Sequence, residues 1–72
     1  MAIDIEYQNS LGEIVLSENV EIIIKGNKEI SFEYIEMIIS KSLQDPNIIK
    51  DYNTPIKKII IVPDKLINFV TY

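Results

Sequence analysis

The spacing of hydrophobic residues divides this chain of 72 residues into one helical stretch between two regions of strand character. From Ser31 to Gln44 the apolar side chains recur every three or four residues, which is the period of an α-helix. On either side of this stretch, apolar residues alternate with polar ones or form short runs rich in isoleucine, as they do in β-strands. The pattern therefore predicts strands, then one helix, then strands.

The predicted helix has one apolar stripe and a signal for each of its ends. The stripe consists of Phe32, Ile35, Ile39 and Leu43. Ser31 is the expected N-cap, because a serine hydroxyl can accept a hydrogen bond from a free amide of the first turn. Asp45 precedes a proline and is expected to end the helix. A further helical turn, capped by Asp45, would tuck Ile48, Ile49 and Tyr52 under the domain.

Five strands are predicted in the flanking regions. They span Ala2–Tyr7, Glu13–Leu16, Val20–Lys25, Ile56–Val62 and Leu66–Tyr72. Turn-forming residues separate them, including a tight connection over residues 17–19. For the last segment, a short helix capped by Asp64 is the alternative. The order β-β-β-α-β-β indicates a single α+β domain over residues 1–72, a small two-layer fold in which one helix packs across one face of a mostly antiparallel sheet.

Strict alternation assigns each side chain of a strand to one face of the sheet. In the second strand, Ile14 and Leu16 are expected to point inward. In the fourth strand, alternation separates Ile56 and Ile60 from Ile59 and Ile61. One short helix covers only one face, so the opposite face should be polar.

Instead, the predicted opposite face carries several large apolar side chains. They are Ile23, Ile59, Ile61, Ile67 and Phe69, and we predict that they bind a partner or a second copy of the chain. Three arrangements would cover them. The last strand could fold back to close a small barrel, the sheet could pack on a second copy in a two-fold dimer, or another protein could dock there.

The composition argues against catalysis and against several classes of ligand. The sequence holds no histidine and no cysteine, so the usual nucleophile–base pairs and thiolate metal sites cannot be built from it. Oxygen ligands follow Asp45, but they lack the glycine and the terminal glutamate of a calcium loop. We therefore expect no catalytic residues, no metal and no cofactor.

Charge is distributed unevenly along the chain. Residues 1–45 hold nine acids and three lysines (−6), and residues 46–72 hold two acids and four lysines (+2), which gives the net charge of −4. An acidic chain of this kind is a poor candidate for direct nucleic-acid binding. The N-terminal residues do not resemble a signal peptide, and the run from Ile59 to Val62 is too short for a membrane span. We expect a cytoplasmic protein with no membrane partner.

Three functional hypotheses follow from these patterns. The first is a small non-enzymatic protein-interaction module, a regulator or inhibitor of the kind that phages and mobile elements carry, which acts by surface binding and forms homodimers through the isoleucine-rich sheet face. The second is an acidic protein that mimics nucleic acid and inhibits a basic nucleic-acid-binding protein, with Glu33 and Glu36 as surface candidates. The third and weaker hypothesis is that a dimer interface sequesters a small charged metabolite. In all three, the expected macromolecular partner is another protein or a second copy.

Overall fold

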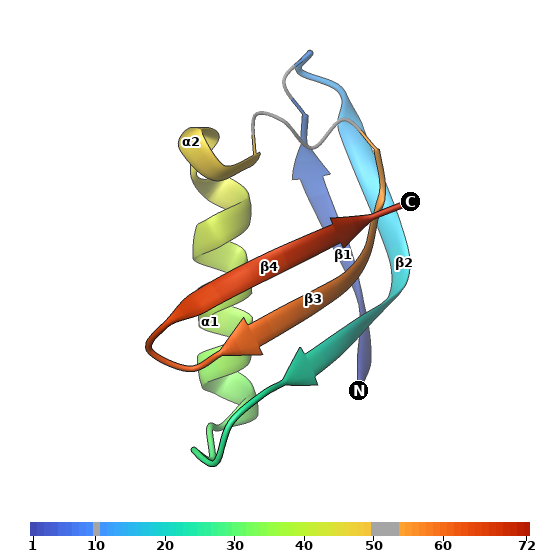
Figure 1. Cartoon of the computed structure of the whole chain (residues 1–72). Helices are drawn as coiled ribbons and strands as arrows, with labels where there is room; N and C mark the ends of the chain where they lie inside the picture. Colours follow the sequence, from blue (N-terminus) through green and yellow to red (C-terminus); the bar gives the residue numbers. More distant parts are fainter. Residues whose placement is uncertain (10, 50–53) are drawn as a thin grey trace.

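A computed structural model describes residues 1–9, 11–49 and 54–72 of the chain. Within these residues the chain forms four strands and two helices (Figure 1). The elements are β1 (Ala2–Gln8), β2 (Ile14–Ile24), α1 (Phe32–Gln44), α2 (Pro46–Ile49), β3 (Ile56–Val62) and β4 (Leu66–Thr71). The predicted helix, its following turn and the strand character of the last segment are therefore confirmed. Ile48, which was expected to tuck under the domain, is 40% exposed, so that expectation is wrong for Ile48. The expected positions of the Ile49 and Tyr52 side chains lie outside the part of the chain that the structure describes.

The described strands form one sheet in the order β1-β2-β3-β4. The pairs β1–β2 and β3–β4 are antiparallel, and β2 runs parallel to β3. A parallel pair needs a long crossover connection, and α1 lies in the segment that joins β2 to β3. The helix lies along one side of the sheet (Figure 1), so the predicted two-layer α+β fold is confirmed, with one parallel pair in a mostly antiparallel sheet.

The second and third predicted strands are one continuous strand, so the prediction of five strands is wrong. Residues 17–19 are not a connection but an irregularity within β2, where the pairing with β1 shifts between Ile3 and Ile5. Asn19 adopts a φ of 54° there, a left-handed conformation that asparagine tolerates better than most residues. The Asn19 amide donates to Asp4 Oδ1 across the pair at 2.8 Å. A turn-forming residue therefore bends this strand without ending it.

The irregularity at Asn19 changes which side chains of β2 point inward. Val15 and Ser17 share a face with Val20, whereas Ile14 and Leu16 are exposed on the opposite face. The expectation that Ile14 and Leu16 point inward is therefore wrong. Ile14 and Leu16 are in phase with Val20 and Ile22 by strict alternation, but β2 contains one additional residue between Ser17 and Val20, and an additional residue reverses the face assignment on one side of it.

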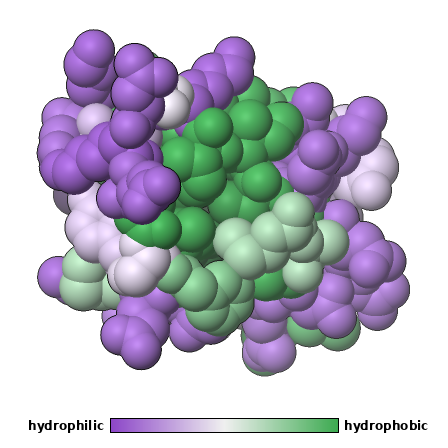
Figure 2. Space-filling model, turned by 90° about the horizontal axis from the view of Figure 1, so that it is seen from below, coloured by the Kyte–Doolittle hydropathy of each residue, from purple (hydrophilic) through white to green (hydrophobic). Residues whose placement is uncertain are grey.

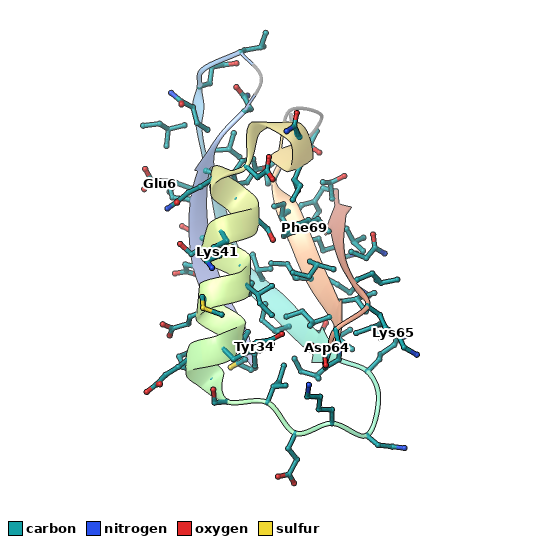
Figure 3. All side chains as sticks on the ribbon, turned by 90° about the vertical axis from the view of Figure 1, so that its left-hand side faces the viewer. Glu6, Tyr34, Lys41, Asp64, Lys65 and Phe69 are labelled. Atoms are coloured by element: carbon teal, nitrogen blue, oxygen red, sulfur yellow. The ribbon has the colours of Figure 1, made fainter. Side chains whose placement is uncertain are left out.

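The helix begins at the predicted cap and buries the middle of the predicted stripe. The Ser31 hydroxyl accepts a hydrogen bond from the Tyr34 amide at 3.1 Å. Ile35 and Ile39 of α1 are buried against the sheet. We call the side of the sheet that is turned to α1 the inner face (Figure 3). Its buried apolar residues are Ile5, Tyr7, Val20, Ile22, Ile56, Ile59, Ile61 and Phe69.

A small polar network joins β1, β2 and the start of β3 inside this apolar core. The buried Ser17 hydroxyl accepts a hydrogen bond from the Ile56 amide at 2.7 Å. The Tyr7 hydroxyl donates to the Thr54 carbonyl oxygen. The backbone pairing of β2 with β3 begins further along, at Glu21, so the Ser17 side chain supplies the acceptor that a strand neighbour would otherwise provide.

Replacing Ser17 with alanine should destabilise the fold by about 1–3 kcal/mol, because the buried Ile56 amide loses its acceptor. The free energy of unfolding in urea measures this loss. Ser40→Ala, which alters an exposed serine of α1, is the matched control and should change stability by less than about 0.5 kcal/mol. Equal effects of the two substitutions would contradict the role given to the Ser17 hydroxyl.

The Tyr7 phenol should make stability depend on alkaline pH. Burial raises the pKa of Tyr7 above its usual value, and a hydrogen bond with Ser17 opposes this rise. The folded state therefore favours the neutral phenol. The stability that the buried neutral phenol contributes is fully present below about pH 10, and it is lost as the pH rises through the pKa of Tyr7 in the folded state.

Unfolding curves of the parent and Tyr7→Phe, measured on both sides of pH 10, test this expectation. The parent should lose stability more steeply than the variant above pH 10. Tyr72→Phe changes an exposed tyrosine and is the control. An unchanged slope in Tyr7→Phe would show that the Tyr7 phenol does not titrate in the way proposed.

Candidate interaction surface

The face of the sheet that is turned away from α1 is the outer face. It carries a set of apolar side chains, which we call the outer patch. It consists of Ile23, Ile60, Val62, Leu66 and Val70. Each of these residues alternates with a residue of the inner face. Four of the side chains are partly buried by their neighbours, and Leu66 is 55% exposed.

The strand register makes the outer patch continuous. Ile23 is the cross-strand partner of Ile60, and Val62 is the partner of Leu66. Lys58 pairs with Val70 on the same face, next to Ile60 along the strand. Seen from the end of the molecule where β2 and β3 finish, the surface shows one apolar area surrounded by polar side chains (Figure 2). Contiguous apolar surface of this kind is typical of interaction sites, whereas single exposed apolar residues are ordinary.

In the structure, most of the predicted binding residues lie on the inner face of the sheet and not on the outer face. Ile59 and Ile61 are 0% and 1% exposed, and Phe69 is buried with them in the core beneath α1. Ile67 packs against the same core. Phe69, which lies on the same strand, is labelled in Figure 3. The expectation that these four side chains form an open surface is wrong, and only Ile23 lies on the outer face as predicted.

A β-bulge in β3 explains the error. Ile56 pairs with Thr71 and Lys58 pairs with Val70, so β3 contains one more residue, Lys57, than the strand beside it. The bulge places Ile56 on the same face as Ile59, three positions later, although strict alternation separates them. The inward set of β3 therefore includes Ile59 and Ile61, and the outward set includes Ile60.

Sequence reasoning missed four members of the outer patch, namely Ile60, Val62, Leu66 and Val70. One signal pointed to them. Lys57 and Lys58 are consecutive polar residues in a strand that is otherwise apolar, and two neighbouring polar positions are difficult to reconcile with strict alternation in a half-buried strand. A bulge at this pair would have exchanged the two faces of the strand.

The charged residues next to the outer patch include both signs. Glu21 and Lys58 are cross-strand partners on β2 and β3, and both belong to the outer face. At the turn between β3 and β4, Lys28 forms an ion pair with Asp64 (Figure 3 labels Asp64). The hydrogen bond to Asp64 and then its negative charge raise the pKa of the exposed Lys28 ammonium. This pair connects the loop after β2 to the turn that presents Leu66.

The turn between β3 and β4 has Pro63 and Asp64 at its two central positions. The Lys65 amide donates to the Val62 carbonyl at 3.0 Å, and Asp64 takes a φ of 62°. A proline followed by a residue of positive φ is typical of a type II turn. At the opposite end of this hairpin, the Lys57 ammonium lies 5.8 Å from the centre of the Tyr72 ring. Both ends of the β3–β4 hairpin are therefore held by side-chain contacts.

The acidic surface candidates lie on α1. Glu33 and Glu36 are exposed on α1, in keeping with their assignment to the surface. Among the described residues, no group of three or more aspartates and glutamates is placed to hold a metal ion. In the same part of the chain, neither helix has the length and apolar character that crossing a membrane requires.

Comparison with known proteins gives no relative from which a function could be carried over. No protein-family model, curated protein or solved structure matches this chain.

Proposed function

We propose that this chain is a small non-enzymatic interaction module that forms a homodimer through the outer patch. The observation that carries the proposal is the register of β2, β3 and β4, which gathers five apolar side chains on the face without a helix. Burial of apolar surface between two copies contributes about 25 cal/mol per Å² to their association, and this gain opposes the loss of translational and rotational freedom on binding. The proposed setting is the cytoplasm.

The charges beside the outer patch favour a second copy of the chain as the occupant. Glu21 and Lys58 give the border of the patch one acid and one base. When two such surfaces pack together, the acid of one copy can face the base of the other. Self-association therefore does not require like charges to be buried together. Acting by surface binding, the dimer would serve as a regulator or inhibitor.

The proposed interface is small. The sheet is about 19 Å wide at about 4.8 Å per strand, and β3 with its seven residues is about 23 Å long. A surface of these dimensions has an area of about 440 Å², roughly half of the 800 Å² per partner that is standard for specific interfaces. We therefore expect a reversible dimer whose average mass falls on dilution.

Ile60→Asp should weaken the dimer roughly a hundredfold or more, because the two-fold symmetry introduces the buried charge twice. Light scattering across a dilution series measures the change. Ile14→Asp is the matched control, since Ile14 is 68% exposed on the same face but lies outside the outer patch. The control should assemble like the parent.

Two outcomes would contradict the proposal. One is a parent protein that stays monomeric at every concentration, and the other is an Ile60→Asp variant that assembles like Ile14→Asp. Ile60 is a better position for this test than Ile61, because Ile60 lies on the outer face, whereas a charge at the buried Ile61 would unfold the domain and remove every interface with it.

A further inference from the structure

We infer that the two copies pack with their outer faces together about a two-fold axis that runs along the strands, between β2 and β3. This inference rests on the self-association proposed above and specifies how one copy recognises the other. It follows from the order of side chains across the sheet, which is complementary to itself when it is reversed.

One row of the outer face crosses all four strands. Ala2 of β1 pairs with Glu21 of β2, Glu21 pairs with Lys58 of β3, and Lys58 pairs with Val70 of β4. The row therefore reads small apolar, acid, base, apolar. A two-fold rotation about an axis between β2 and β3 reverses this order in the second copy. Glu21 then faces Lys58 of the second copy, and Ala2 faces Val70.

The neighbouring row of the outer face gives the same result with apolar residues. Ile23 of β2 and Ile60 of β3 are cross-strand partners, and Asn68 follows on β4. The same axis places Ile23 of one copy over Ile60 of the other. Exposed Asn68 lies beyond this pair, towards the solvent. The centre of the interface is therefore apolar, and the ion pairs border it, as is common in protein interfaces.

Three other positions of the axis oppose like charges. An axis along β2 places Glu21 of one copy opposite Glu21 of the other, and an axis along β3 does the same with Lys58. An axis across the strands, level with this row, brings both like-charged pairs together. Like charges that face each other across an interface cost affinity, so the charges favour the axis between β2 and β3 over these three positions.

Mixing two charge variants tests the inference. Glu21→Lys opposes lysines in its own homodimer, and Lys58→Glu opposes glutamates, so each homodimer should be about tenfold weaker than the parent. In a heterodimer of the two variants, both contacts pair lysine with glutamate. The mixture should therefore form heterodimers, recovered by an affinity tag on one variant, at concentrations at which neither variant alone dimerises, which shows that this row lies in the interface.

The double variant Glu21→Lys/Lys58→Glu distinguishes the axis. It should dimerise with itself like the parent but form few mixed dimers with the parent, because both mixed contacts then oppose like charges, whereas an axis across the strands would favour the mixed dimer.

Matched controls separate this contact from overall charge. Glu33→Lys and Lys41→Glu change exposed residues of α1 and give the same net charges as the test variants, −2 (from −4 + 2) and −6 (from −4 − 2). They should dimerise like the parent and gain nothing on mixing. If the test pair behaves like the control pair while the parent dimerises, the inferred axis is wrong and the proposed self-association stands. If the parent is monomeric, both proposals fail.

Discussion

The hydrogen bond from the Ile56 amide to the Ser17 hydroxyl joins the two halves of this fold at the point where backbone pairing is missing. One half is the β1–β2 hairpin, and the other is the β3–β4 hairpin that returns beyond α1. An amide buried without an acceptor would cost about 1–3 kcal/mol, a substantial part of the stability of a domain this small. The serine thus lets the chain start β3 beside β2 before the parallel ladder begins, and the faces of β3 are set from that point.

Two added residues decide how the faces are filled. The irregularity at Asn19 and the bulge at Lys57 each displace the alternation by one position, on neighbouring strands. As a result, Ser17 shares the inner face with Val20, and Ile56 shares it with Ile59. It also leaves Ile60 outward, at the centre of the outer patch. The polar junction in the core and the apolar group on the surface are therefore two results of the same geometry.

The sequence was sufficient for the class of fold and for its helix, because the period of 3.6 residues, the Ser31 cap and the Asp45–Pro46 boundary are local signals that agree with one another. It was insufficient for the faces of β2 and β3, because one added residue reverses every assignment beyond it, and in β3 its only local sign is the consecutive pair Lys57 and Lys58. Ile23 was placed correctly because the stretch of β2 that pairs with β3, from Glu21 to Ile24, contains no irregularity. Ile59 and Ile61 were misplaced since they follow the bulge, and the error passed to their partners Phe69 and Ile67.

An apolar group on the outer face has a consequence for stability as well as for binding. A domain of about 70 residues buries only about 60–65% of the surface that its unfolded chain exposes, which leaves little margin. Association that requires the folded state adds to the free energy of unfolding by mass action, in proportion to the logarithm of concentration. Ile23 and Ile60 lie on strands whose opposite sides carry Ile22 and Ile59 in the core. A dimer that holds the outer side of these strands therefore also restrains the strands that build the core, so that assembly and folding support each other in the same part of the sheet.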